Sequence, residues 1–272
     1  MSDFFRDVSP AGLARANELN LQAFKRLIGV EFGGEVVEKP GLTLTVTLIP
    51  YPFFNGVADA HLTAASAAQA IAEASAYFAA RQSPWAWSIG PSTEPANLSD
   101  VLLAAGFAED DPEPAMGMDL EKLTRFPGPS GLRIERVRTP ELLAVWQRTA
   151  VEGFGMPSEA SAIFARTTPT TNLADDAPMR QYLGWTGDVP VATCLLVLAA
   201  GVAGIYTVST VERMRGRGIG AAMTTAALRE AREMGYRVGI LQASAIGYPV
   251  YERLGFREHF RYRVFVAPRM PA

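Results

Sequence analysis

A run of prolines and glycines at residues 126–131 restricts the possible folds of this chain more than any other local feature. The run reads Phe-Pro-Gly-Pro-Ser-Gly. It can continue neither a helix nor a central strand, because proline lacks the backbone N–H that both require. The run lies near the middle of 272 residues, a length that favours two domains over one. We therefore predict a linker at 126–131 between a first domain, 1–125, and a second domain, 132–272.

The composition excludes several classes of protein. Hydrophobic residues make up 49% of the chain and charged residues 19%, so it can bury sizeable cores and is not a disordered protein. The net charge of −3 argues against nucleic-acid binding, which normally needs a basic surface. One cysteine, Cys194, and two histidines rule out an internal disulfide and a thiolate cluster, so we expect no metal.

One uncharged run, from Val189 to Val208, is about as long as the ~20 residues that span a membrane. Ala200-Gly201 and Gly204 interrupt it, and its many Val, Thr and Leu residues favour β-structure. We interpret it as two buried strands joined by a tight turn. The N-terminus lacks the basic and apolar segments of a secretory signal, so we expect a cytoplasmic protein without membrane contact.

The second half alternates strands with helices, a pattern that predicts an α/β sheet domain. The predicted strands cover 132–137, 180–186, 189–198, 204–210, 237–243 and 261–266, and the predicted helices cover 139–151, 219–234 and 249–254.

The first half repeats the end of this order. A long helix at 63–82 is followed by a strand at 85–89, a short helix ending at Gly106 and a strand at 115–120. We infer a diverged internal duplication. Trp85 and Trp87 share one face of their strand, so they are expected in the first half's core, with an acceptor pocket as the alternative.

A glycine-rich turn, Arg215-Gly216-Arg217-Gly218-Ile219-Gly220, separates a predicted strand from a predicted helix. The start of a helix has unpaired N–H groups and a positive dipole end, and glycine lets an anion approach the backbone. A P-loop is excluded because Ala221-Ala222 follow where Lys-Ser/Thr is needed. A dinucleotide fingerprint fits poorly, because the next strand ends in Leu241-Gln242-Ala243-Ser244, without an acidic residue for the ribose.

Two segments resemble the GCN5-related N-acetyltransferases, the GNAT family. Arg215-x-x-Gly218-x-Gly220 resembles the family's pyrophosphate loop, and residues 244–256, which end in Tyr251-Glu252-Arg253-Leu254-Gly255-Phe256, resemble a second family segment. The resemblance covers about residues 132–267, and the first half is similar to the degenerate first repeat of tandem bacterial members. It implies an α/β (α+β) chain of two GNAT-like repeats, each a mixed, mostly antiparallel, V-splayed sheet flanked by helices.

The resemblance implies that the second repeat binds acetyl-CoA, and the first does not. The pantetheine arm would pair with the strand ending at Thr210, and the loop amides would bind the pyrophosphate. The cofactor-binding residues implied in this way are Ser209, Thr210, Val211, Arg215, Gly216, Arg217, Gly218, Ile219, Gly220, Ala221 and Ser244. The side chains of Arg215 and Arg217 either contact phosphate or are solvated.

The implied reaction is acetyl transfer to a primary amine of a small-molecule or peptide acceptor, by direct attack on the thioester. Tyr251 matches the family's thiolate-protonating tyrosine. Alternatively, Tyr251 only packs its short helix onto the sheet. Tyr248 is then the alternative residue that could protonate the thiolate. The central strand carries no carboxylate, so Glu152 is a candidate base, with a solvated loop charge or a water chain as alternatives. Cys194 is expected in the core, and His259 in a structural role.

The missing carboxylate leaves a second function open, that of a non-catalytic acyl-CoA-binding or regulatory module. We further expect a monomer in which the first repeat packs on the second like an internal dimer partner.

Overall fold

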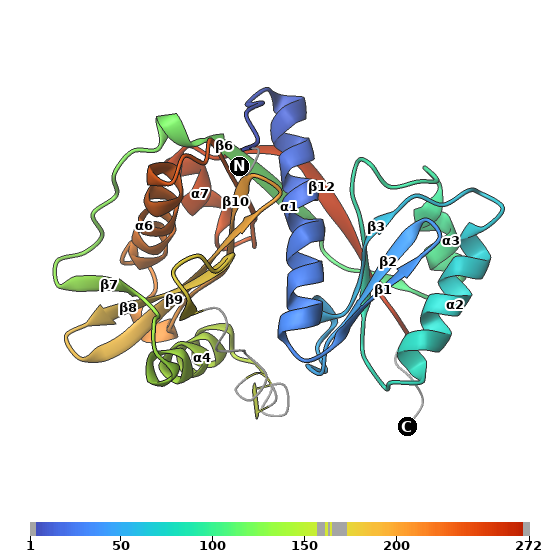
Figure 1. Cartoon of the computed structure of the whole chain (residues 1–272), viewed down its shortest axis with the longest axis horizontal. Coiled ribbons are helices and arrows are strands. Elements are labelled where there is room, and N and C mark those ends of the chain that lie inside the picture. The colour runs from blue at the N-terminus through green and yellow to red at the C-terminus, as the bar shows by residue number, and fades with distance from the viewer. Residues whose placement is uncertain (1–3, 157–160, 163, 165–172, 269–272) are drawn as a thin grey trace. The chain divides into compact units, whose positions relative to one another are not determined.

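The structure is a computed structural model that describes residues 4–156, 161–162, 164 and 173–268 (Figure 1). These residues form two compact units. The first unit holds the described residues of 1–20, 114–165 and 169–259, and the second holds those of 21–113 and 260–272.

The first unit is built on a mixed, mostly antiparallel sheet. Its strands are β6 (Glu113–Asp119), β7 (Leu132–Arg136), β8 (Met179–Thr186), β9 (Val189–Ala199), β10 (Val202–Thr210) and β11 (Val238–Gln242). Their order is β6-β11-β10-β9-β8-β7. Among these pairs only β10 and β11 run parallel. This arrangement confirms the predicted sheet type.

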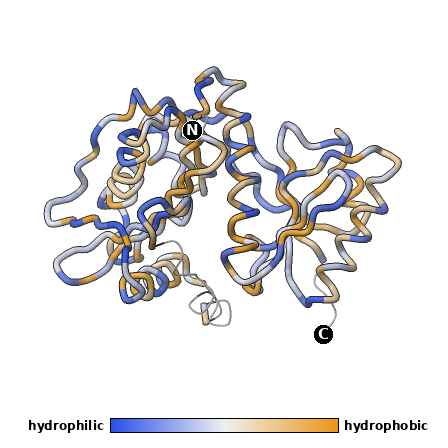
Figure 2. Tube along the Cα trace, viewed as in Figure 1, coloured by the Kyte–Doolittle hydropathy of each residue, from blue (hydrophilic) through white to orange (hydrophobic). Residues whose placement is uncertain are grey.

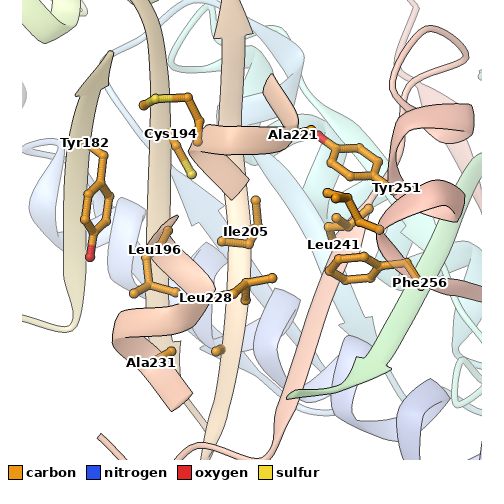
Figure 3. Close-up of a cluster of buried hydrophobic side chains, with 14 of the residues drawn as sticks. Tyr182, Cys194, Leu196, Ile205, Ala221, Leu228, Ala231, Leu241, Tyr251 and Phe256 are labelled. Atoms are coloured by element: carbon orange, nitrogen blue, oxygen red, sulfur yellow. The ribbon is translucent and has the colours of Figure 1, made fainter. Parts of the chain in front are cut away.

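Three helices accompany this sheet: α4 (Pro140–Phe154), α6 (Ile219–Glu233) and α7 (Tyr248–Leu254). Helix α4 begins as predicted, because the hydroxyl of Thr139 accepts a hydrogen bond from the amide of Leu142. Helix α6 buries its alanine-rich face in the core cluster shared with β9, β10 and β11 (Figure 3). Cys194 is fully buried in this cluster, as expected.

The uncharged run 189–208 forms strands β9 and β10, as predicted. Ala200 and Gly201 have φ angles of +53° and +71° in the turn between them. Such left-handed conformations match the right-handed twist of a two-residue hairpin. No helix among the described residues is long and apolar enough to cross a membrane.

The second unit contains β1 (Glu35–Lys39), β2 (Leu42–Val46), β3 (Gly56–Ala60), β4 (Ala86–Ile89) and part of β12 (Arg257–Val266), in that order, with β5 (Ala108–Glu109) paired to β12. Its helices are α2 (Ala67–Ala79) and α3 (Leu98–Ala104). Trp85 and Trp87 are buried in its core, and Trp85 stacks on Phe78 at 4.4 Å between ring centroids. Their predicted core role is confirmed.

The compact units do not follow a linear division at 126–131. Strand β6, which comes after Gly106-Phe107, pairs with β11, whereas β12, which comes after Gly255-Phe256, pairs with β4. Each unit therefore takes a strand from the other half of the sequence. Residues 123–131 form neither helix nor strand.

Helix α1 (Pro10–Glu31) was not expected from the sequence. Hydrophilic and hydrophobic segments alternate along it (Figure 2), but three of its buried positions, Asn17, Glu18 and Asn20, are polar. Within the first unit, the amide of Asn17 donates to the carbonyls of Met116 and Leu241. The amide of Asn20 donates to three carbonyls of the β9–β10 hairpin. Buried asparagines of this kind blur the apolar period of a helix.

Candidate active site

Strands β10 and β11 separate partway along their length. They pair only from Ala203↔Gly239 to Ile205↔Leu241, although β10 continues to Thr210. The pairing of β10 with β9 shifts register between Tyr206 and Ser209, and Thr207 there has a φ of +49°. A bulge with a left-handed threonine re-aims the strand at this point. Because β11 ends at Gln242, the edge of β10 after Ile205 is free of β11, as the predicted V-shaped splay requires.

Polar contacts from β9 hold the bulge in place. The hydroxyl of Thr193 donates to the carbonyl of Thr207 at 2.9 Å and lies 2.8 Å from the Ser209 hydroxyl. On the other side, a Cβ on Gly153 of α4 would lie 2.4 Å from the Ser209 Oγ, so only glycine fits there. Ser209 was expected at the site from the sequence, whereas Thr193 and Gly153 were not.

The glycine loop connects β10 to α6 through the short turn η4 (Glu212–Met214). Gly216 and Gly218 have φ angles of +76° and +77°, and Gly218 is the N-cap of α6. Gly220 is different, because its φ is not positive and a Cβ there would meet nothing closer than 3.8 Å. The fold itself therefore leaves room at Gly220, beside Val208 and Thr210 of the splayed strand.

The loop's two arginines have different surroundings. The guanidinium of Arg215 donates to the carbonyls of Thr210 and Gly153, at 3.1 and 2.9 Å. It thereby ties the loop to β10 and α4, and it uses a carbonyl that was expected to face the pantetheine arm. Arg217 is exposed and makes no hydrogen bond or ion pair with the described residues.

Glu152 lies in the last turn of α4 and forms an ion pair with Arg213 of η4. Both side chains are more than half exposed. The structure therefore brings the predicted base next to the loop, but on its solvent side.

Tyr251 is buried on α7, with its ring edge-on to Phe256 at 6.0 Å between centroids (Figure 3). A Cβ on Gly247 would lie 2.8 Å from this ring, so the glycine before α7 makes space for it. Burial raises the pKa of the Tyr251 hydroxyl well above its ordinary value near 10. The hydroxyl therefore carries its proton at neutral pH and can act as a hydrogen-bond donor.

The remaining expected residues lie on α6, α7 and β12 or directly after β10 and β11. Ser244 follows β11 and is exposed, and its hydroxyl accepts the amide of Gly247 at 3.2 Å. Tyr248 begins α7 and packs against the core cluster. Ile219 and Ala221 are buried in the first turn of α6, whereas Val211 is buried directly after β10. His259 is half buried, and burial lowers the pKa of its imidazole.

Among the described residues, no group of three or more His, Cys, Asp or Glu side chains could hold a metal ion.

One family model matches the part of the chain that contains the glycine loop. Residues 199–258, which run from the end of β9 through β10, the loop, α6 and α7, match the family described as Acetyltransferase (GNAT) domain. No curated protein matches the chain by sequence.

Solved structures share the fold over almost the whole chain. A GCN5-related N-acetyltransferase from Kribbella flavida is 21% identical, with a TM-score of 0.71 over 92% of this chain and 95% of that one. One from Sphaerobacter thermophilus is 17% identical, with a TM-score of 0.64 over 98% and 95%. A tandem GNAT protein from the clavulanic acid biosynthesis pathway is 14% identical, with a TM-score of 0.60 over 95% of each chain.

The GNAT domain match over residues 199–258 indicates an acyltransferase, and the solved structures show that the chain has the fold of such enzymes. Residues 199–258 match the GNAT family, as the two sequence segments predicted, and the tandem GNAT structure, which shares the fold of this chain, supports two repeats. Acetyl transfer is the general activity of this family.

Proposed function

We propose that the first unit transfers the acetyl group of acetyl-CoA to a primary amine of a small-molecule or peptide acceptor. The observation that carries this proposal is the separation of β10 from β11 after Ile205, directly beside the glycine loop. An extended thiol arm needs a free strand edge, and a diphosphate needs free helix amides. The open space at Gly220 lies between these two features.

In this proposal the amides of residues 216–221 bind the diphosphate, and the exposed guanidinium of Arg217 adds positive charge. Arg215 ties the loop to β10 and α4, because its Nε and Nη2 atoms donate to the carbonyls of Thr210 and Gly153. When bound, acetyl-CoA supplies a thioester carbonyl that a neutral amine attacks, which forms the amide and releases the CoA thiol. Tyr251 donates its proton toward the leaving sulfur.

A base or a desolvating pocket is needed for the acceptor. A lysine-like amine with a pKa of ~10.4 is neutral in only about 1 of 2,500 molecules at pH 7. Glu152 is the candidate on this chain, and Glu152→Gln tests it beside Arg213→Gln, which removes the same ion pair. A fall in kcat confined to Glu152→Gln supports the base. Equal effects of both variants show that the pair only holds the loop.

The second candidate is a non-catalytic acyl-CoA-binding module, because β10 contains no carboxylate. Two measurements distinguish the acetyltransferase from the binding module. Calorimetry measures the binding of acetyl-CoA, and assays of thiol release and of product mass over a panel of amines measure acetyl transfer. We expect acetyl-CoA to bind. We also expect the amount of released thiol to equal the amount of acetylated amine. Binding without any acetylated product would favour the module.

We also propose a cytoplasmic monomer, and a stable dimer in light scattering at micromolar concentration would contradict the monomer.

A further inference from the structure

The linker between the halves runs along helix α6 before it reaches β7. The guanidinium of Arg232 donates to the carbonyl of Leu123 at 3.1 Å, and the hydroxyl of Thr225 lies 3.4 Å from the carbonyl of Phe126. Gly128, with a φ of +75°, is pressed against the helix, because a Cβ there would lie 2.8 Å from the Cβ of Ala222. The linker is thus fixed to α6 on both sides of Phe126.

This attachment places the ring of Phe126 beside the N-cap of α6. Its Cε1 and Cζ atoms lie 3.1 Å from the position that a Cβ on Gly218 would take. The residue nevertheless keeps 40% of its surface exposed. The ring thus contacts the N-cap of α6 and still leaves part of its surface accessible to a ligand.

The ring's surroundings match the chemistry of a nucleotide. The first turn of α6 presents free amides suited to a diphosphate, and Arg217 adds an exposed positive charge in the same loop. In coenzyme A the diphosphate is joined directly to adenosine. A bound diphosphate therefore brings a purine close to the loop, where an exposed aromatic face can stack on it.

We propose that Phe126 stacks on the adenine ring of the bound coenzyme and so forms part of the cofactor site. This inference rests on the proposed function, since it takes the ligand from there. It gives the linker a role in binding, in addition to connecting the two halves. Phe126 contacts neither the thioester nor the acceptor in this arrangement, so it affects affinity for the coenzyme and leaves the acetyl-transfer step alone.

The test compares ligands with and without adenosine. Calorimetry measures the binding of coenzyme A, 3′-dephospho-coenzyme A and 4′-phosphopantetheine to the wild type, Phe126→Ala and Phe126→Trp. We expect Phe126→Ala to weaken both adenosine-bearing ligands about 10-fold, as the loss of one aromatic stack does. Phosphopantetheine should bind within about 2-fold of wild type. Phe126→Trp should restore the binding of coenzyme A. Leu103→Ala removes another exposed apolar side chain, in the second unit, and serves as the matched control.

Two results would overturn the proposal. Unchanged affinity of Phe126→Ala for coenzyme A would exclude the stack, and an equal loss for phosphopantetheine would show that the ring only orders the loop. Failure of the proposed function would give a different result from failure of the Phe126 stack. In that case the wild type itself would bind neither coenzyme A nor phosphopantetheine.

Discussion

The hydroxyl of Thr193 lies 2.9 Å from the carbonyl oxygen of Thr207, across the strand pair β9–β10. Because the Thr193 proton is used by this carbonyl, the Ser209 hydroxyl donates its own proton to Thr193 at 2.8 Å. The two bonds lie on either side of the bulge, where Thr207 has its left-handed backbone conformation. A buried threonine on β9 thus holds the bulge that follows the last residue of β10 paired with β11.

Replacing Thr193 by valine keeps the shape of the side chain but removes both hydrogen bonds. We expect a loss of about 1–3 kcal/mol in the free energy of unfolding, because a buried carbonyl and a buried hydroxyl lose their partner. We also expect a several-fold weaker Kd for acetyl-CoA, measured by calorimetry. Thr193→Ser, which keeps the hydroxyl, is the control. An unchanged Kd in Thr193→Val would show that the bulge does not depend on this contact.

Gly220 allows the cofactor site to be blocked without harming the fold. An aspartate there has room for its Cβ, and its charge is favourable near the N-terminus of α6. We expect Gly220→Asp to keep the melting temperature of the wild type and to weaken acetyl-CoA binding by about 100-fold or more, because like charges repel at the same amides. Gly220→Ala should bind nearly normally. Normal binding by Gly220→Asp would place the diphosphate elsewhere.

Gly218 is a poorer choice for that test. Its φ of +77° means that any other residue strains the backbone by about 1–2 kcal/mol. A loss of binding in Gly218→Ala would therefore mix strain with loss of the site.

Tyr251→Phe separates catalysis from binding. The variant keeps the buried ring that contacts Phe256 but cannot donate a proton. We expect kcat to fall by about 100-fold and the Kd for acetyl-CoA to stay within about 2-fold. Because burial raises the pKa of Tyr251, ionisation of this group should not reduce the wild-type kcat below about pH 10. A normal kcat in the variant at every pH would remove the acid role.

Local sequence features predicted much of the fold and of the cofactor loop. Thr139-Pro140 predicted the start of α4, and the glycines at 216, 218 and 220 predicted the start of α6. These signals work because capping and positive φ angles depend on neighbouring residues only.

Long-range pairings could not be predicted in the same way. Nothing in the composition of 113–119 says that this strand pairs with 238–242, which follows it by more than a hundred residues. Thr193 is an ordinary strand former until its partner Thr207 is known, and Glu152 is an ordinary surface charge until Arg213 lies beside it. In each case the role depends on a partner distant in the sequence.

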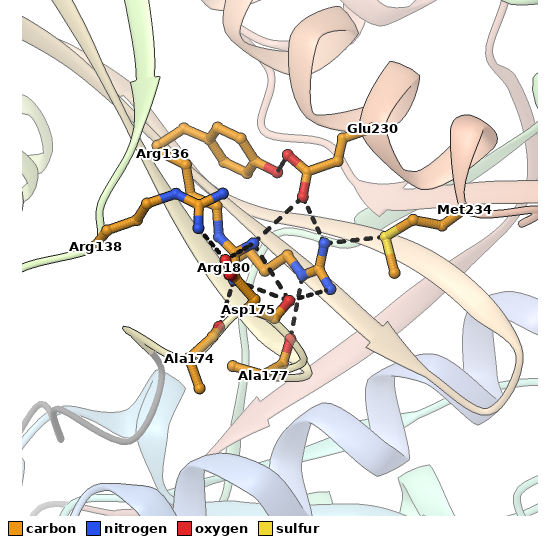
Figure 4. A network of polar contacts seen from close by, with 9 residues as sticks. Arg136, Arg138, Ala174, Asp175, Ala177, Arg180, Glu230 and Met234 are labelled. Atoms are coloured by element: carbon orange, nitrogen blue, oxygen red, sulfur yellow. Dashed lines mark hydrogen bonds and ion pairs between the residues drawn. The ribbon is translucent and has the colours of Figure 1, made fainter.

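A charge network that contains two buried arginines lies at the far end of α6 (Figure 4). The carboxylate of Glu230 accepts the hydroxyl of Tyr182 at 2.6 Å and faces the guanidinium groups of Arg136 and Arg180, whose side chains are only 7% and 6% exposed. Glu230→Gln leaves these two buried cations without that carboxylate. We expect it to lower the free energy of unfolding by about 2–4 kcal/mol in urea titration.

Glu233→Gln on the same helix is the control for the network. Among the residues that the structure describes, Glu233 pairs only with Arg229, at 3.8 Å on the exposed surface, and should contribute less than about 0.5 kcal/mol. Equal stability of the two variants would show that Glu230 does not compensate the buried arginines.

Buried tyrosines make the first unit sensitive to alkali. Burial raises the pKa of Tyr182, Tyr206 and Tyr251 above the value near 10 that each has in the unfolded chain. Above about pH 10 the unfolded chain therefore loses protons that the folded chain keeps, and stability falls as the pH rises. Below about pH 10 the stabilising contribution of these hydroxyls is fully present.

Tyr206→Phe should change this dependence in a specific way. The hydroxyl of Tyr206 donates to Asn20 at 2.9 Å, so at pH 8 its loss should cost about 1 kcal/mol of stability. Above about pH 10 the variant should lose about 1.4 kcal/mol less per pH unit than the wild type, because one proton fewer is released on unfolding. Urea titrations at pH 8, 10 and 11 measure both effects, with the exposed Tyr51→Phe as the control. Identical slopes for Tyr206→Phe and wild type would mean that Tyr206 ionises equally easily in the folded and unfolded chain.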